Sequence, residues 1–423
     1  MKRYLYLPKQ YDLVVGDTFE LFYRGIVNCA SIDCYDFEIF YEDGGNRGKG
    51  FARKYLFTPT EADVGVHTMH IRLYNNEGEV LDERSVTVNI VMPPKSPTEE
   101  RVVLLVGASD AGPGIWPSEV GRRLVGEGGK PQGSALANVS FIGSRERDGI
   151  RYEGYGGWTF ASYSTANLRD DFMILTGDFR DKVADVDQHS FYADETGRKW
   201  KLESIAPDRI KIICESALGV LPSVEGGRLT HASGGQNHGD IVYTSAHRAD
   251  ANPFWSAELG RNDFKSYAAR FGKERIDEIV VTLTWNSYRM EKEAYKALVR
   301  RFVESVHADY PACHITFVGG IFPSRDGFAQ NYGISWPWFP MLTVLRNFDD
   351  VKEELVAEDP LRLSFVHLAS QLDMDHNAIF ADFEANVRSE ATVRLGSNGL
   401  HLTPGGSLQI ADAIWRHLST RFG

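Results

Sequence analysis

A serine in a glycine-rich turn is the first residue that could do chemistry. Ser109 stands in Gly-Ala-Ser-Asp-Ala-Gly (107–112), directly after the continuous apolar run Val102–Val106. Open α/β sheets carry their sites at the carboxyl ends of buried strands, where a turn can aim backbone N–H groups at a developing oxyanion. A phosphate-binding loop would need lysine where Pro113 stands, and a Gly-x-Ser-x-Gly elbow would need glycine at Ala111. Taken alone, the motif marks a plain turn residue more often than a nucleophile.

A histidine near the end of the chain could supply the base that a serine nucleophile needs. His401 follows Asn398-Gly399-Leu400 in a segment that we interpret as a loop before an amphipathic terminal helix. A neutral imidazole can take a serine proton near neutral pH. Without Ser109, the simpler interpretation is a surface histidine near a helix start.

Two further segments could donate hydrogen bonds to an oxyanion. Asn286, in Thr-Trp-Asn-Ser (284–287), follows a predicted buried strand, where its carboxamide could serve as a donor or simply pin the loop. Gly154 lies in Glu-Gly-Tyr-Gly-Gly-Trp-Thr (153–159), whose glycines permit a tight backbone with a free N–H or merely a flexible turn.

In the order Ser, Gly, Asn and His, these segments resemble the sequence blocks of the SGNH/GDSL hydrolases, a family of serine esterases. The resemblance covers roughly residues 100–175 and 250–423. Residues 107–109 are similar to the GDS block, 153–159 to the EGRSGWT stretch of acetylesterase-like members, 284–287 to GxND and 398–401 to DxxH. The run Asn252-Pro253-Phe254-Trp255 is similar to members from gut bacteria and their phages.

The resemblance implies a three-layer α/β/α, flavodoxin-like domain with a parallel sheet, and an enzyme that hydrolyses carboxylic esters. Ser109 would attack the ester carbonyl, and His401 would take its proton. The backbone N–H groups of Ser109 and Gly154, with the Asn286 side chain, would hold the oxyanion. No cofactor and no metal is implied.

The sequence departs from the family pattern at the residue that orients the base. Asn398 replaces the triad aspartate, and an amide cannot stabilise an imidazolium with a full charge. Three explanations are open: a Ser–His dyad oriented by Asn398 or a backbone carbonyl, an acid from elsewhere, or a weak or inactive hydrolase kept for glycan binding or adhesion. The acids in question are Asp373, Asp375 and Asp382. Ala108 also replaces the usual aspartate of the first block, and we expect Asp110 to support that turn instead.

The expected substrate is an O-acyl ester, with O-acetyl as the first choice, on a carbohydrate. Aromatic side chains in predicted loops could present flat faces to sugar rings, although many such residues pack locally. The candidates are Tyr155, Trp158, Trp255 and Trp285, with Trp336 and Trp338 in similar segments. A metallohydrolase is disfavoured because its candidate ligands have spacings that fit no helix face. These ligands would be His231, His238 and His247.

Four parts of the chain must position these residues. Residues 1–95 contain short alternating runs separated by turn signals, as in an Ig-like β-sandwich, and the proline-rich segment 96–100 is a stiff linker. Residues 101–177 and 249–423 alternate buried apolar runs with helical patterns, which indicates a parallel sheet. We interpret 178–248, which has short β-like runs and no helical pattern, as a β-rich insertion.

Composition excludes several classes of function. The net charge of −12 offers no general attraction for nucleic acid, and no run of about 18 apolar residues could span a bilayer. The first residues show no signal-peptide pattern. We expect a secreted, cell-surface or virion-associated protein, with a cytoplasmic location as the alternative, and the sequence leaves the oligomeric state open.

Overall fold

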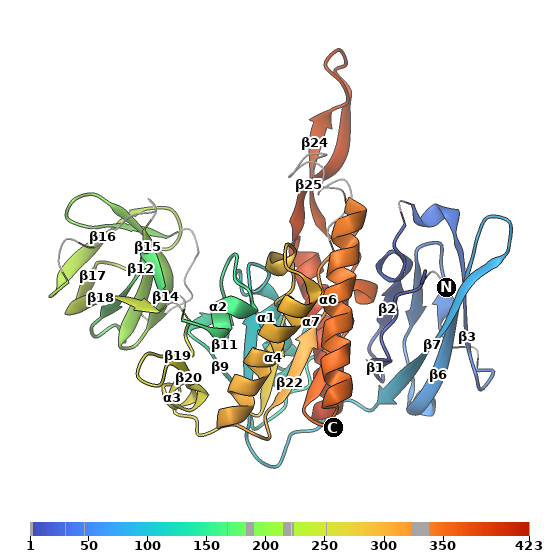
Figure 1. Ribbon diagram of the computed structural model, residues 1–423, viewed down its shortest axis with the longest axis horizontal. Coiled ribbons are helices and arrows are strands. Elements are labelled where there is room, and N and C mark those ends of the chain that lie inside the picture. The colour runs from blue at the N-terminus through green and yellow to red at the C-terminus, as the bar shows by residue number, and fades with distance from the viewer. Residues whose placement is uncertain are drawn as a thin grey trace.

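Three parts lie in a row along the long axis of the molecule (Figure 1). The computed structural model describes residues 3–29, 31–45, 47–166, 168–182, 190–214, 221, 224–250, 252–322 and 338–422. The middle part is α/β, the parts on either side of it are built of β-strands, and a long hairpin projects from the middle part.

The N-terminal part consists of two sheets around one apolar core. Its strands are β1 Gln10–Val14, β2 Phe19–Phe22, β3 Asp36–Tyr41, β4 Lys49–Gly50, β5 Lys54–Phe57, β6 Gly65–Tyr74 and β7 Val80–Val91. The sheets have the orders β1-β7-β6-β3 and β2-β5-β4. Alternation decides which side chains enter the core: Met69, Ile71 and Leu73 of β6 are buried, whereas His70 and Arg72 between them are not. Each short strand predicted here overlaps an observed one.

A mainly parallel sheet forms the middle part. Its strands are β8 Arg101–Gly107, β9 Val139–Ile142, β10 Arg145–Arg147, β11 Ile150–Gly154, β21 Glu278–Val281, β22 His314–Val318 and β23 Leu363–Val366. The order is β10-β11-β8-β21-β22-β23, with β9 also paired to β8, and β10 is antiparallel to β11. Every residue of β21 and β22 is buried, which explains why these segments read as nearly continuous apolar runs. The predicted parallel sheet is confirmed.

Helices cover both faces of this sheet. The helices are α1 Ile115–Val125, α2 Phe160–Ser164, α3 Phe264–Ala269, α4 Lys292–Asp309, α6 Trp338–Glu358 and α7 Pro404–Arg421. The side chains of Val103 and Leu105 pack with α1 and α7, whereas Leu104 and Val106, which point the other way, pack with α4. The long helices occupy the segments that the helical periodicity predicts. In the described ranges, no helix has the length and apolar run needed to cross a bilayer.

A second, antiparallel sheet is inserted between β11 and β21. Its strands are β12 Leu168–Thr176, β13 Phe191–Ala193, β14 Lys199–Ala206, β15 Arg209–Cys214, β16 Gly227–Ser233, β17 Ile241–Tyr243 and β18 Ser245–Asp250. The order is β17-β16-β13-β14-β15-β12-β18, and buried side chains such as Trp200 and Ile212 form its own core. The sheet includes β12, which the predicted boundary at 177 leaves outside. The short strands β19 Trp255–Ser256 and β20 Arg261–Asn262 follow it.

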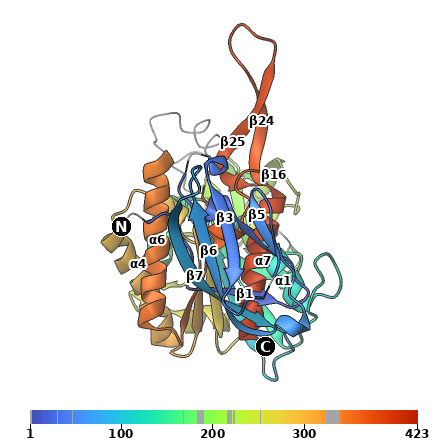
Figure 2. The ribbon, with the colours of Figure 1, turned by 90° about the vertical axis from the view of Figure 1, so that its right-hand side faces the viewer.

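A projecting hairpin carries His401. It consists of β24 Ala378–Glu384 and β25 Thr392–Leu402, and it stands clear of the rest of the molecule in Figures 1 and 2. The prediction of a loop around His401 is therefore wrong, because His401 is the last but one residue of strand β25. Ala378 pairs with Leu402, but the next residue, Ile379, pairs with Asn398. Residues 399–401 are therefore extra residues on the β25 side of the hairpin. Asn398 and Gly399 therefore belong to a β-bulge within the strand and not to a turn.

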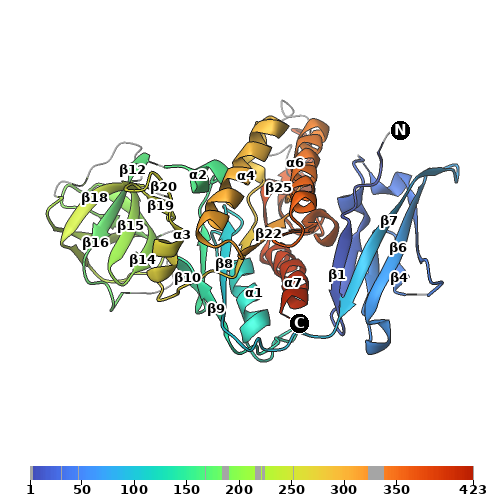
Figure 3. The ribbon, with the colours of Figure 1, turned by 60° about the horizontal axis from the view of Figure 1, so that its bottom comes forward.

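An ion cluster joins the N-terminal part to the α/β part. Asp17 pairs with Arg123 of α1 at 2.6 Å and with Arg416 of α7 at 2.8 Å, and all three side chains are at most 6% exposed. Nearby, a Cβ on Gly25 would stand 1.7 Å from the carbonyl oxygen of Ala369, so the two parts meet backbone to backbone. Figure 3 shows the contact of β1 with α7.

We expect the substitution Asp17→Asn to lower the free energy of unfolding by about 3–5 kcal/mol, the usual cost of leaving buried charges without their partner. Urea unfolding followed by tryptophan fluorescence measures this loss. Asp36→Asn is the matched control, because Asp36 is exposed at the start of β3. If both variants lost the same amount, the cluster would not be what joins the two parts.

Candidate functional site

The turn that carries Ser109 is held by the carboxylate of Asp110. This carboxylate accepts hydrogen bonds from the backbone N–H of Ala108 at 3.0 Å, from Trp116 Nε1 at 3.1 Å and from Thr282 Oγ1 at 2.6 Å. Burial raises the pKa of Asp110 above its ordinary value, while these donors act in the opposite direction. The expectation that Asp110 supports the turn is confirmed.

Ser109 and Asn286 line one small hollow at the carboxyl end of the sheet. Its volume is about 20 Å³, and its lining is Ala108, Ser109, Asp110, Thr282, Thr284, Trp285, Asn286 and Ile321. Within the described part of the chain, neither the hydroxyl nor the backbone N–H of Ser109 makes a hydrogen bond. Asn286 donates one amide hydrogen to the carbonyl of Trp158 at 2.9 Å, so its second amide hydrogen remains to be used.

Gly154 lies behind the Ser109 turn. A Cβ at this position would stand 2.7 Å from the Cβ of Ala111 and 3.1 Å from the backbone nitrogen of Gly112. Arg145 donates to the Gly154 carbonyl at 3.1 Å. Gly154 is the last residue of β11 and pairs with Gly107, the last residue of β8, so the glycine lets two backbones approach closely at the site. Its part in an oxyanion hole stays a prediction.

A buried lysine beneath the hollow is a residue that sequence reasoning missed. Lys352 of α6 donates to the Thr284 hydroxyl and, at 2.8 Å, to the Val318 carbonyl, and it lies 3.7 Å from Asp349. It thereby ties the carboxyl ends of β21 and β22 together. The pKa of Lys352 is lowered to about 8, chiefly by burial. The signal in the sequence is its spacing, since Lys352 falls on the same helix face as the buried Phe348 and Leu355.

The imidazole of His401 is oriented by Asn398. The backbone N–H of His401 donates to Asn398 Oδ1 at 3.2 Å, so the amide nitrogen faces the ring and lies 3.0 Å from Nδ1. An amide NH₂ can only donate, which leaves Nδ1 as the acceptor and places the proton of the neutral ring on Nε2. To fix the tautomer that a base requires, the carbonyl of Asn398 would have to accept from Nδ1–H, and the observed arrangement is the reverse.

The three acids considered as partners of His401 do not contact it in the described structure. Asp373 pairs with His376 at 3.0 Å, Asp375 pairs with Arg53 at 2.9 Å, and Asp382 lies exposed on β24. None of these acids contacts His401 in the described structure, so the explanation of an acid from elsewhere finds no support. Among the residues that the structure describes, no hydrogen bond joins His401 to Ser109. The pairing of serine and imidazole therefore remains a prediction.

The four aromatic candidates occupy three kinds of place. Tyr155 and Trp158 are buried, at 4% and 5% exposure, and their rings pack together with centroids 4.4 Å apart. Their burial favours a packing role over contact with a substrate. Trp285 lines the Ser109 hollow, whereas Trp255 lines a separate and much larger cavity. Trp336 and the side chain of Trp338 lie outside the described residues.

The three histidines considered as metal ligands do not come together in the described structure. His231 Nε2 bonds to the carbonyl of Gly234, and the backbone N–H of His238 donates to the Tyr192 hydroxyl. The side chain of His247 lies outside the described residues. Within the part of the chain that the structure describes, no group of histidine, cysteine and acidic side chains has the arrangement of a metal site.

No protein-family model and no curated protein matches the sequence. Among solved structures, the chain is similar to a carbohydrate esterase family 2 enzyme with a carbohydrate-binding domain from Corynascus thermopiles (Myceliophthora fergusii), at 12% identity and TM-score 0.32 over 99% of both chains. A family two carbohydrate esterase from Cellvibrio japonicus matches at 9% identity and TM-score 0.27, over 96% of this chain and 85% of that one. A peptidoglycan O-acetylesterase matches at 10% identity and TM-score 0.33, over 77% and 92%. At these TM-scores, function has to be argued from the residues of this chain.

We expect Gly154→Ala to lower the free energy of unfolding by about 1–3 kcal/mol, because the added methyl group must push the Ser109 turn aside. Guanidinium chloride unfolding measures the change. Gly156→Ala is the matched control, since a Cβ at Gly156 meets nothing within 4 Å. Equal stability of the two variants would contradict the close packing of Gly154 against the turn.

Proposed function

We propose that the protein is an SGNH-type serine esterase that hydrolyses O-acyl groups, O-acetyl groups first of all, on a carbohydrate. The observation that carries the proposal is the hollow at the end of β8. Ser109 and Asn286 line this hollow together; among the described residues the hydroxyl and the backbone N–H of Ser109 make no hydrogen bond, and Asn286 uses one of its two amide hydrogens on Trp158. A nucleophile and oxyanion donors around one point are what acyl transfer requires.

The proposal extends to the architecture. We propose a three-layer, flavodoxin-like hydrolase domain that is preceded by a β-sandwich at 1–95 and interrupted by the inserted sheet, whose limits move from the expected 178–248 to the span from β12 to β18. We number the parallel strands along the chain and count β9 and β11 together as the second strand. Their order across the sheet is then 2-1-3-4-5, which is the flavodoxin-like order. Helices on both faces of the sheet support the same layering.

In the proposed reaction, Ser109 Oγ forms a bond to the acyl carbon while its proton passes to Nε2 of His401. The negative charge on the carbonyl oxygen is held by the N–H groups of Ser109 and Gly154 and by the Asn286 amide. Collapse breaks the ester C–O bond, and the imidazolium gives its proton to the leaving alcohol. A water molecule then attacks the acyl-serine by the same steps, which releases the acid and restores the hydroxyl.

The base step requires a change at Asn398. With the amide nitrogen against Nδ1, the neutral ring carries a proton on Nε2, the atom that would have to accept one from Ser109. Rotation of the Asn398 amide would expose its oxygen to Nδ1 and exchange the tautomer, at the cost of the bond to the His401 backbone N–H. Asparagine at this position in serine proteases lowers turnover by about 10⁴, chiefly through the wrong tautomer.

The same geometry is compatible with a second candidate function. A catalytically weak or inactive protein that uses the same scaffold to bind or adhere to glycans would tolerate an imidazole held in the unproductive tautomer. The two candidates differ in whether the Ser109 hydroxyl supports turnover.

We expect the wild-type chain to hydrolyse p-nitrophenyl acetate faster than buffer does, and Ser109→Ala to lose this excess, because the acyl-serine can no longer form. Release of p-nitrophenol is followed by absorbance. Ser389→Ala, in the turn of the hairpin, is the matched control and should keep the wild-type rate. Equal rates above the blank for wild type and Ser109→Ala would reject Ser109 as nucleophile, and rates equal to the blank for both would favour the binding protein.

We further expect Asn398→Asp to raise kcat/KM for the same ester by about 10²–10⁴, because a carboxylate accepts Nδ1–H and frees Nε2 to act as base. Asn386→Asp, near the tip of the hairpin, adds the same charge without touching His401 and should leave the rate unchanged. No gain in the Asn398 variant would mean that another group orients the imidazole during turnover.

A further inference from the structure

A large cavity opens between the inserted sheet and the α/β part, away from the Ser109 hollow. Its volume is about 720 Å³, which is within the range of ligand-binding sites. Three segments build it: β9 to β11 of the central sheet, the turn between β14 and β15, and residues 252–273. The cavity and the Ser109 hollow share no lining residue.

Cations dominate the wall of this cavity. Among the described residues, the lining contains Arg151, Arg209, Lys211, Arg270 and Lys273 but only one acid, Asp208. Asp208 pairs with Arg209 at 2.6 Å. Arg151 and Lys273 have partners outside the lining, Glu146 and Glu100.

Two of the five cations lack a carboxylate partner at ion-pair distance among the described residues. Arg270 donates to the Pro253 carbonyl at 3.1 Å, and Lys211 donates to the Tyr155 hydroxyl at 3.3 Å. The pKa of Lys211 is lowered to about 8, chiefly by burial, with the neighbouring guanidiniums of Arg270 and Arg209 acting in the same direction. An anion in the cavity would offset this mutual repulsion.

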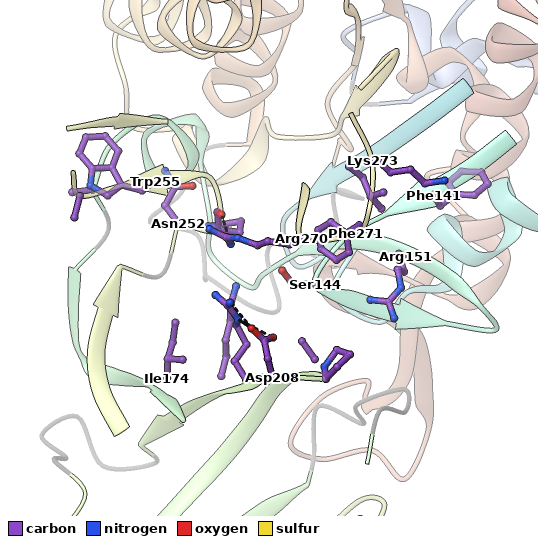
Figure 4. A pocket seen from close by; sticks show the side chains of 18 residues that line it. Phe141, Ser144, Arg151, Ile174, Asp208, Asn252, Trp255, Arg270, Phe271 and Lys273 are labelled. Carbon is purple, nitrogen blue, oxygen red and sulfur yellow. Dashed lines mark hydrogen bonds and ion pairs between the residues drawn. The ribbon is translucent and has the colours of Figure 1, made fainter. Parts of the chain in front are cut away.

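Two aromatic side chains line the same cavity as Arg270. In Figure 4, Arg270 lies between Trp255 on one side and Phe271 on the other, with Asn252 close by. Trp255 and Phe271 are both only partly buried, and both line the cavity. Aromatic faces suit sugar rings, and a guanidinium suits a carboxylate, which it can bind with two parallel hydrogen bonds.

We propose that this cavity binds a carboxylate-bearing saccharide, with the sugar carboxylate on Arg270 and a ring against Trp255. The site is independent of the proposed esterase reaction, since it needs neither Ser109 nor His401. A bound uronic acid would supply the carboxylate that Arg270 lacks. The inserted sheet would then serve as a recognition element, because the Asp208 turn forms one wall of the cavity.

Isothermal titration calorimetry on the full chain at low salt tests the proposal, with digalacturonate as the probe and the neutral digalactoside as its counterpart. We expect digalacturonate to bind at least tenfold more tightly than the neutral sugar. Arg270→Ala and Trp255→Ala should each weaken digalacturonate at least tenfold. Lys265→Ala, which removes an exposed charge from the adjacent helix α3, is the matched control and should bind as the wild type does.

Two further measurements show whether the cavity recognises the sugar carboxylate. Ser109→Ala should bind digalacturonate with wild-type affinity, so this result stands whether or not the chain is an esterase. Inorganic phosphate should compete at least tenfold more weakly than digalacturonate. The proposal is overturned if digalacturonate does not bind, if the neutral sugar binds equally, if phosphate competes equally, or if folded Arg270→Ala and Trp255→Ala keep wild-type affinity.

Discussion

The candidate site depends on one buried carboxylate. Asp110 bonds to its own turn, to Trp116 at the start of α1 and to Thr282 at the end of β21, and so it connects the elements that bring Ser109 and Asn286 together. An outward movement of the turn would leave a buried charged acceptor without partners, at a cost of about 1–3 kcal/mol or more. Packing behind the turn adds to this constraint, since neither Gly107 nor Gly154 has room for a Cβ. The position of Ser109 is thus set by its surroundings, because its own side chain makes no hydrogen bond to any residue that the structure describes.

Much of the fold and part of the site could be predicted, because their signals are local. Buried parallel strands appear as apolar runs and long helices as periodic patterns, so the sheet and its helix layers follow from segments read one at a time. Ser109 and Asn286 could be placed together because both follow strands of one sheet, and β21 is the neighbour of β8. The features that escaped depend on individual hydrogen bonds, which no apolar pattern records. The hydroxyl of the buried Tyr155 bonds to Glu153 and to the distant Lys211, and the orientation of Asn398 is set by a backbone N–H in a bulge.

A buried polar network runs from the wall of the large cavity toward the strand that ends near the Ser109 turn. Lys211 donates to Tyr155, and Tyr155 donates to the buried carboxylate of Glu153 at 2.6 Å, one residue before Gly154. Tyr267 and the backbone N–H of Ser144 donate to the same carboxylate. A fully bonded buried network of this kind is rigid. The inserted sheet is therefore joined to the strand that ends beside Ser109 through hydrogen bonds as well as through the chain.

The bulge at the base of the hairpin separates the Asn398–His401 pair from the outer arm of the hairpin. Without the bulge, a change in the outer arm would shift the register of both residues. In an unbroken antiparallel ladder, side chains at positions 398 and 401 would point to opposite faces, and a slip of one residue would exchange them. The extra residues of β25 let the two side chains meet, and they lie at the end of the arm that joins α7. Beyond them, the outer arm with its tip at Val387, which is 96% exposed, can be shortened, lengthened or redecorated by evolution while the imidazole keeps its place.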